Sequence, residues 1–259
     1  MICSSLDQFW TTFFALDYAS AGKPEMLYRG MTDSSFQLIP SIGRDTQAGT
    51  SGDINSLEDS LLKEFKRLTV PLLTQIPNSD FEWLFLAQHY GLPTRLLDWT
   101  TNPLVALFFA SEGHDDKDGV IHYLPHMVSD QFDLFDFKTA DYNNQARKNP
   151  ISVFAIQPSQ SRVIFVRPRY TDERYINQKS VFSCPKDPFT PLEHPDKNEL
   201  VIKAEWKSQI RKRLYTMGMS TSFIYPGLAG VASDIKKLQF NPITEGRMQI
   251  VTVRCEIKL

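Results

Sequence analysis

The order of hydrophobic and polar residues along this chain predicts a mixture of helices and strands. Residues 9–16 carry apolar side chains at helical intervals, and the preceding Ser5-Leu6-Asp7-Gln8 has the spacing of a capping box, so we expect a first helix that ends near Tyr18. Residues 26–31 form a short apolar run with one arginine, which predicts a buried strand ending at a glycine. A charged side chain inside such a strand is costly, and this arginine is therefore a candidate functional residue.

Caps, prolines and glycines define the remaining elements. Helices are expected at residues 56–68, 81–90, 104–111, 205–217 and 226–238, and strands at residues 119–124, 161–166, 181–182, 200–204 and 249–258. Glu58 is expected on the solvent side of its helix, and the segment that contains Pro93 is expected to be irregular.

The strands do not alternate regularly with helices, so we predict the α+β class. The prediction is a single domain over residues 1–259, with a mixed or antiparallel sheet core flanked by helices. Its first part, to about residue 112, is expected to be helical, and the remainder rich in strands with a final helix and a C-terminal strand.

Composition narrows the class of protein. The 259 residues are 42% hydrophobic and 22% charged, which is typical of a globular protein, and a net charge of -2 argues against nucleic-acid binding by bulk electrostatics. Cys3, Cys184 and Cys255 are far apart and lack CxxC spacing, which argues against a disulfide framework or a cysteine zinc site. No leader pattern and no run approaching ~20 apolar residues is visible, so we expect a cytoplasmic protein without a membrane partner.

The densest group of chemically useful side chains lies in residues 88–103, between two apolar helices. One interpretation is a binding site. The other is a structural network in which Arg95 pairs with Asp98, Thr101 caps a helix, and His89 is stabilised at a helix C-terminus by the helix dipole. Buried ionisable groups need partners under either interpretation, and the concentration of such groups favours a site.

Three motifs resemble the FRG domain, a family named for a Phe/Tyr-Arg-Gly tripeptide. They are Tyr28-Arg29-Gly30, the run from Ala87 through Thr100 followed by Pro103 to Ala110, and the segment 224–232. The resemblance covers about residues 5–240. The chain departs from the family around residues 174–182, where Ser180 stands in place of a usual glycine.

The order of elements also resembles ADP-ribosyltransferases of the arginine-serine-glutamate kind. This resemblance implies NAD as the substrate, with Arg29 on its phosphates and a hydroxyl strand at Thr100-Thr101 near the nicotinamide. A guanidinium on a rigid strand suits a diphosphate because it binds two oxygens at once. The residues expected to act in catalysis are Arg29, His89, Thr100, Glu173 and Gln178, and those expected to bind NAD are Tyr28, Arg29, Gly30, Tyr90, Arg95 and Thr101.

The acidic residue of this pattern is the least defined. Glu173 and Gln178 are the candidates, but neither lies in a Glu-X-Glu strand motif, and Glu173 also fits an exposed turn. The expected function is therefore an NAD-using ADP-ribosyltransferase-like enzyme, a toxin or antiphage effector acting on a protein or nucleic-acid acceptor. The alternative is a non-catalytic FRG module that binds a nucleotide or a partner protein as a sensor.

A metal site is not expected. His122 and His126 would share one face of a strand about 13 Å apart, with no carboxylate at ligand spacing. Arg211-Lys212-Arg213 is expected to form a solvated basic face of a helix.

Overall fold

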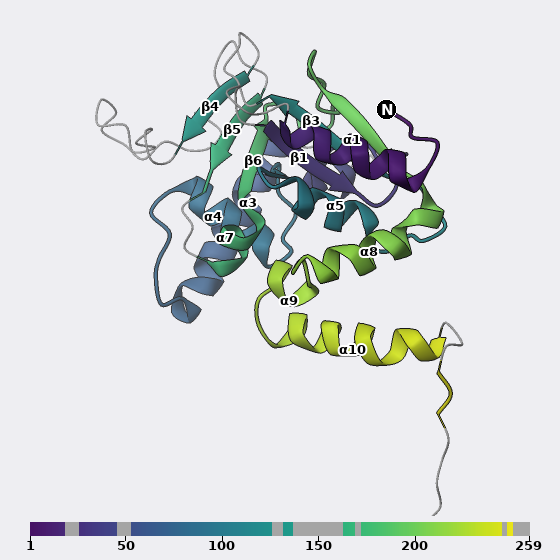
Figure 1. Ribbon diagram of the computed structural model, residues 1–259. Coiled ribbons are helices and arrows are strands. Elements are labelled where there is room, and N and C mark those ends of the chain that lie inside the picture. The colour runs from purple at the N-terminus through teal and green to yellow at the C-terminus, as the bar shows by residue number, and fades with distance from the viewer. Residues whose placement is uncertain are drawn as a thin grey trace, which may run out of the picture.

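A single mixed sheet forms the centre of the molecule, as the predicted α+β class requires (Figure 1). The computed structural model describes residues 1–18, 26–45, 53–125, 132–136, 163–168, 172–244 and 248–250. Within these residues seven strands lie in the order β4-β5-β6-β2-β1-β3-β7, and every neighbouring pair is antiparallel except β4 with β5. The strands are β1 (Met26–Met31), β2 (Leu97–Thr100), β3 (Gly119–Pro125), β4 (Phe132–Asp136), β5 (Val163–Arg167), β6 (Ser180–Pro185) and β7 (Asn198–Ile202).

Helices cover the sheet and extend beyond it. They are α1 (Leu6–Tyr18), α2 (Ser41–Asp45), α3 (Ile54–Thr69), α4 (Asp80–His89), α5 (Pro103–Ser111), α7 (Glu173–Gln178), α8 (Lys207–Thr216), α9 (Thr221–Ile224) and α10 (Leu228–Thr244), with 3-10 turns at Val70–Leu72 and Ala204–Trp206. Helix α10 packs against α9 at the lower edge of the molecule in Figure 1. None of the helices in the described ranges is long and apolar enough to cross a bilayer.

Local signals explain where most helices begin and end. The side chain of Asn102 accepts a hydrogen bond from the backbone N–H of Leu104, and Pro103 follows it, so α5 begins at Pro103, one residue before the predicted start. Asn102 caps this helix, so the prediction that Thr101 is the cap was wrong. Helix α3 is capped by Asp53 and α4 by Ser79, so these helices begin at Ile54 and Asp80, two residues and one residue before the predicted starts. The differences are small because several candidate cap residues stand side by side in the sequence.

Some predictions were wrong. The segment expected to be irregular contains β2, a central strand of the sheet, and residues 173–178 form a short helix that the sequence pattern did not indicate. Helix α10 begins at Leu228 and continues to Thr244, so it starts later and runs further than expected. In the predicted C-terminal strand, residues 249–250 have no regular structure, and residues 251–258 lie outside the described residues.

The two faces of the sheet carry different cores. On one face, α1, α5 and α8 pack with Tyr28, Ile121 and Leu200, and a second cluster of α3, α4 and α7 packs with Ile164 and Phe182. The opposite face carries a third cluster; it includes Leu27, Met31, Trp99, Val120, Phe165 and Val181. The first face is therefore divided between two helix groups, and polar residues lie between them.

The glycine of Tyr28-Arg29-Gly30 allows α5 to approach the sheet. A Cβ atom at Gly30 would lie 1.8 Å from the carbonyl oxygen of Ala106, and one at Gly119 of β3 would lie 2.2 Å from the carbonyl oxygen of Ala110. No side chain fits at either distance, so the two glycines set how closely α5 packs on β1 and β3.

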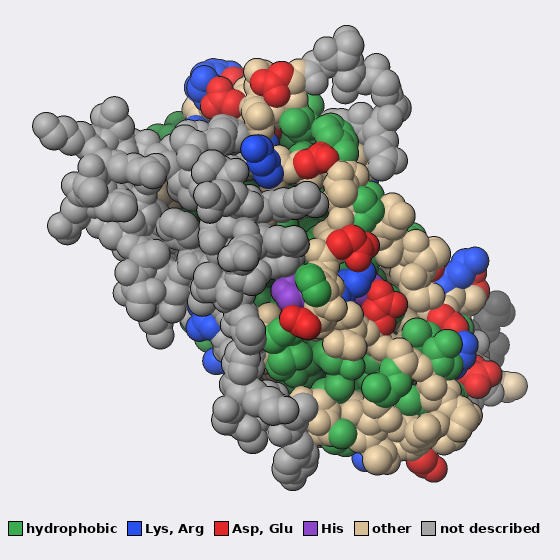
Figure 2. Space-filling model, turned by 90° about the horizontal axis from the view of Figure 1, so that it is seen from above, with side chains coloured by type: hydrophobic (Ala, Val, Ile, Leu, Met, Phe, Trp, Pro, Cys, Tyr) green, Lys and Arg blue, Asp and Glu red, His purple; other side chains and the backbone are tan. Residues whose placement is uncertain are grey.

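Charged side chains are mixed on the molecular surface that Figure 2 presents. Acidic and basic side chains of the described residues are interspersed there, without a broad patch of one sign. This distribution agrees with the small net charge of the chain.

Candidate functional site

A pocket of about 250 Å³ lies where β1 and β2 meet, between the two helix groups. Its walls come from β1, β2, α5, α7 and the residue after α9; they are Arg29, Gly30, Asp98, Trp99, Thr100, Val105, Phe109, Arg174, Gln178 and Tyr225. Strands β1 and β2 are paired only at Tyr28 and Thr100 within the described residues, whereas β1 pairs with β3 along its whole length. Beyond this pair, Arg29 and Gly30 follow Tyr28 in β1, whereas Asp98 and Trp99 precede Thr100 in β2, and these residues line the pocket, which we call the Arg29 pocket.

Arg29 is held at the end of this strand pair by β2. Its Nη1 donates a hydrogen bond to the carbonyl oxygen of Asp98 and lies 3.8 Å from Asp98 Oδ2. The side chain of Arg29 is 16% exposed and that of Asp98 is 59% exposed, so the two charges are not equally removed from water. Nε of Arg29 is buried and has no hydrogen-bond partner among the described residues. The cation is therefore only partly compensated by its surroundings.

Burial lowers the pKa of the Arg29 guanidinium below its ordinary value, and the nearby Asp98 acts in the opposite direction. Arginine stays charged in proteins, so the lowered pKa expresses a cost of holding the cation in place rather than a loss of the proton. A bound anion would offset that cost and would satisfy the free Nε.

Thr100 and Gln178 join β2 to α7 on the floor of the pocket. The Thr100 hydroxyl donates to the carbonyl oxygen of Gln178 at 2.5 Å, and Gln178 Nε2 donates to the carbonyl oxygen of Ile224 at 2.9 Å. Both side chains are buried. Thr101 does not line the pocket, although its backbone N–H donates to the carbonyl oxygen of Lys179 at 3.2 Å. The hydroxyl and amide groups predicted to act in catalysis thus lie together, and their hydrogen bonds also connect β2, α7 and α9.

Arg174 is a second arginine in the Arg29 pocket. Its guanidinium lies over the ring of Tyr225, 4.9 Å from the ring centre, which is the geometry of a cation–π contact. Burial raises the pKa of the Tyr225 hydroxyl, and Arg174 opposes this. Glu173, the adjacent residue, does not line the Arg29 pocket but an open neighbouring hollow, which it shares with Asp172 and Gly227.

His89 and Tyr90 lie beside a different pocket from Arg29. This second pocket, also about 250 Å³, includes residues 73–78 and side chains from α4, and we call it the Tyr90 pocket. The His89 ring contacts the rings of Tyr90 and Tyr175, at centre distances of 4.9 and 5.9 Å. Burial lowers the pKa of His89, and the positive charge of Arg174 adds to this effect, so the imidazole is neutral near pH 7.

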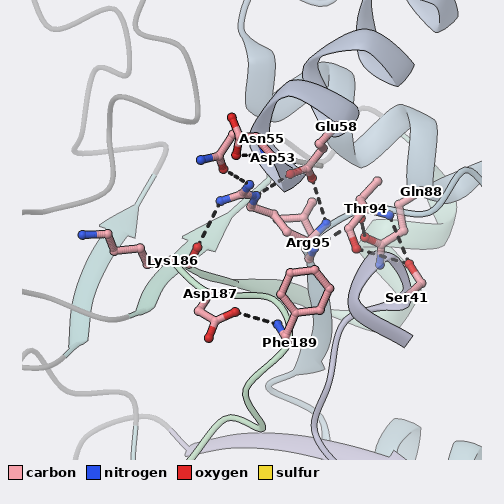
Figure 3. Close-up of polar contacts among 11 residues, drawn as sticks. Ser41, Asp53, Asn55, Glu58, Gln88, Thr94, Arg95, Lys186, Asp187 and Phe189 are labelled. Carbon is pink, nitrogen blue, oxygen red and sulfur yellow. Dashed lines mark hydrogen bonds and ion pairs between the residues drawn. The ribbon is translucent and has the colours of Figure 1, made fainter. Parts of the chain in front are cut away.

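Arg95 does not form the predicted pair with Asp98. It is fully buried and forms an ion pair with Glu58 of α3, whose side chain is 1% exposed, so the prediction that Glu58 faces solvent was also wrong (Figure 3). Arg95 Nη2 donates to Asn55 Oδ1 at 2.5 Å, and its backbone N–H donates to Glu58 Oε1 at 2.9 Å. These bonds fix the start of α3 to the segment before β2, a structural role away from the Arg29 pocket.

Two further residues of the motif serve packing. Tyr28 is 2% exposed and stacks near Tyr123 with α5 over it, and it does not line the Arg29 pocket. Gly30 borders the pocket and permits the approach of α5. Sequence reasoning did not single out Arg174, Tyr225 or the α5 residues as pocket residues. The available signal was that Tyr225, Val105 and Phe109 belong to the motifs that resemble the FRG domain.

The fold and this pocket define an α+β protein with two arginines at the junction of two central strands. Residues 24–119 match the family model of the FRG domain, and this part of the chain belongs to the FRG-domain family. Comparison with curated proteins and with solved structures found no match. The matched residues supply β1, β2 and α5 to the Arg29 pocket, whereas Arg174, Gln178 and Tyr225 come from beyond them.

Proposed function

We propose that the chain binds NAD in the Arg29 pocket and acts as an ADP-ribosyltransferase-like enzyme. The observation that carries this proposal is the partly compensated guanidinium of Arg29, whose buried Nε has no partner among the described residues, in a pocket that a second arginine also lines. Two guanidinium groups suit the two phosphates of a dinucleotide, because each binds phosphate oxygens through a planar pair of donors.

In this proposal Arg29 and Arg174 bind the diphosphate, and Thr100 and Gln178 lie beside the nicotinamide ribose. The bond from C1′ of the ribose to the nicotinamide nitrogen breaks, and its electron pair leaves with neutral nicotinamide. Water or an acceptor nucleophile then forms a bond to C1′ and releases a proton. Polar groups fixed before the reaction stabilise the positive charge that develops at C1′.

The test is a titration of NAD on the wild type, Arg29→Ala and Arg29→Lys, with thermal melts and an assay of nicotinamide release. Charge-assisted hydrogen bonds contribute ~1.5–3 kcal/mol, so Arg29→Ala is expected to weaken NAD binding roughly 10- to 150-fold. Lysine keeps the charge but not the planar fork and is expected to restore binding only in part. Mutants that remain folded and bind NAD as the wild type does would refute the phosphate role of Arg29.

A second candidate function is a nucleotide sensor without turnover. Among the described residues, Asp98 is the sole carboxylate that lines the Arg29 pocket, and it already lies beside Arg29. Glu173 borders the neighbouring hollow instead. Under this alternative the wild type binds NAD and releases no nicotinamide, with or without candidate protein or nucleic-acid acceptors.

A further inference from the structure

The Arg29 pocket and the Tyr90 pocket are joined by the open hollow between them. The hollow shares Arg174 and Tyr225 with the Arg29 pocket, and it shares His89 and Asp172 with the Tyr90 pocket. The three spaces therefore adjoin one another through shared side chains, and we call them together the groove. Its two ends keep a fixed relation, because the Tyr175 hydroxyl on α7 donates to the carbonyl oxygen of Phe85 on α4 at 2.8 Å.

The two ends of the groove differ in charge. One end has two arginines and one carboxylate, from Arg29, Arg174 and Asp98, whereas the carboxylates of Glu82 and Asp172 line the other without an arginine or lysine. An anionic group is favoured at the arginine end and disfavoured near the carboxylates. A ligand that fills the groove would thus place its phosphates on the arginines and an uncharged part in the Tyr90 pocket.

The Tyr90 pocket has the side chains that bind a planar heterocycle. Tyr90 is 71% exposed, which leaves its ring accessible at the rim, and Leu73, Ile76 and Leu86 supply apolar surface. Gln75 and Asn78 carry amides, the groups that proteins use to hydrogen-bond an adenine edge. Aromatic side chains stack on nucleobases whatever their sequence context.

We propose that the Tyr90 pocket binds the adenine base of the ligand whose diphosphate lies on Arg29 and Arg174. This inference rests on the proposed function, because the groove is assigned to one dinucleotide. It gives Tyr90 a role in affinity for the adenosine half that is separate from the role of Arg29.

The test compares ligands that share the arginine end and differ at the other. NAD, ADP-ribose and AMP carry adenine, and nicotinamide mononucleotide does not. Stacking of a base on an aromatic ring contributes ~1–3 kcal/mol to binding. Tyr90→Ala is therefore expected to weaken binding of the three adenine ligands roughly 5- to 150-fold and to leave the affinity for nicotinamide mononucleotide unchanged. Tyr90→Phe is expected to keep wild-type affinity, because the ring remains.

Tyr215→Ala is the matched control, since Tyr215 is a 45% exposed tyrosine that lines none of the three spaces. Equal affinities in wild type and Tyr90→Ala, or an equal loss for all four ligands, would overturn the adenine assignment. If Tyr90→Ala weakens AMP binding while Arg29→Ala changes no ligand, the adenine site stands and the phosphate role of Arg29 fails. If the wild type binds no adenine ligand, both proposals fail.

Discussion

Removing the carboxylate of Glu58 is expected to destabilise the protein strongly, because this carboxylate forms a buried ion pair with Arg95. The side chains of Arg95 and Glu58 are 0% and 1% exposed, and the carboxylate accepts bonds from both Nε and the backbone N–H of Arg95. Asn55 and the carbonyl oxygen of Lys186 also accept hydrogen bonds from Arg95, and both of these groups are neutral.

The size of the effect follows from this burial. Breaking a buried ion pair by removing one partner costs ~3–5 kcal/mol, whereas an exposed pair contributes ~0–1 kcal/mol. Glu64 lies on the same helix and pairs with Arg67, but the two side chains are 56% and 67% exposed. Glu58→Ala and Glu64→Ala thus remove the same group from one helix in opposite environments.

The assay is urea unfolding together with thermal melting of the wild type and both variants. At ~2–4 °C per kcal/mol for a chain of this size, Glu58→Ala is expected to lower the melting temperature by roughly 6–20 °C, and Glu64→Ala by a few degrees at most. A double variant, Glu58→Leu with Arg95→Met, is expected to recover much of the loss because no buried charge remains. Equal melting temperatures for Glu58→Ala and Glu64→Ala would refute the reasoning.

Three further predictions concern other buried groups. Gly30→Ala places a Cβ against the carbonyl oxygen of Ala106, so it is expected to lower the free energy of unfolding by ~1–3 kcal/mol or more and to weaken ligand binding. Gly91 has open space around it but a φ of +87°, so the control Gly91→Ala is expected to lower the free energy of unfolding by ~1–2 kcal/mol and to leave ligand binding intact. Urea unfolding and ligand titration of both variants test this prediction. Burial lowers the pKa of His122 from 6.5 to about 4, so between these pH values the unfolded chain binds a proton that the folded one does not. The free energy of unfolding is therefore expected to fall by up to ~3 kcal/mol on this account as the pH drops from 6.5 to 4. The fall should be smaller by this amount in His122→Gln, and an identical slope in the two proteins would contradict the prediction. Burial raises the pKa of the Cys184 thiol to about 12, so iodoacetamide at pH 8 is expected to alkylate this thiol only after denaturation. Mass spectrometry locates the label, and alkylation of Cys184 in the native protein would contradict the prediction.

Features fixed by local chemistry could be predicted from the sequence. The start of α5 beside Pro103 and the apolar run that became β1 depend on residues within a few positions of one another, and both elements were located to within one residue, although the cap of α5 is Asn102 and not Thr101. Arg29 was singled out because a charged side chain is costly to bury in an apolar strand, and the structure places this side chain in a pocket. The placement of Thr100 and Gln178 beside it agrees with the residues selected from the sequence.

Features fixed by pairing at long range could not be predicted. Glu58 and Arg95 are 37 residues apart in the sequence. The position of Glu58 on its helix indicates a solvent-facing carboxylate, and only the three-dimensional structure shows that Arg95 is its buried partner. The strand β2 has only four residues after a proline segment, too few to show a period, and it is defined by its partners β1 and β6. Arg174 joins the pocket only because α7 packs against α9, which no local pattern indicates.

The arrangement of the strands has a consequence for how much of the chain folds by itself. Residues 24–119, which match the family model, contain β1 and β2 and only the first residue of β3. A fragment with these bounds would retain two strands joined at a single residue pair, with β1 lacking β3 and β2 lacking β6. Two strands alone are marginal in water, and their open edges are templates for aggregation. The span by which the family is detected is therefore smaller than the folding unit, which extends at least through β7 to Ile202.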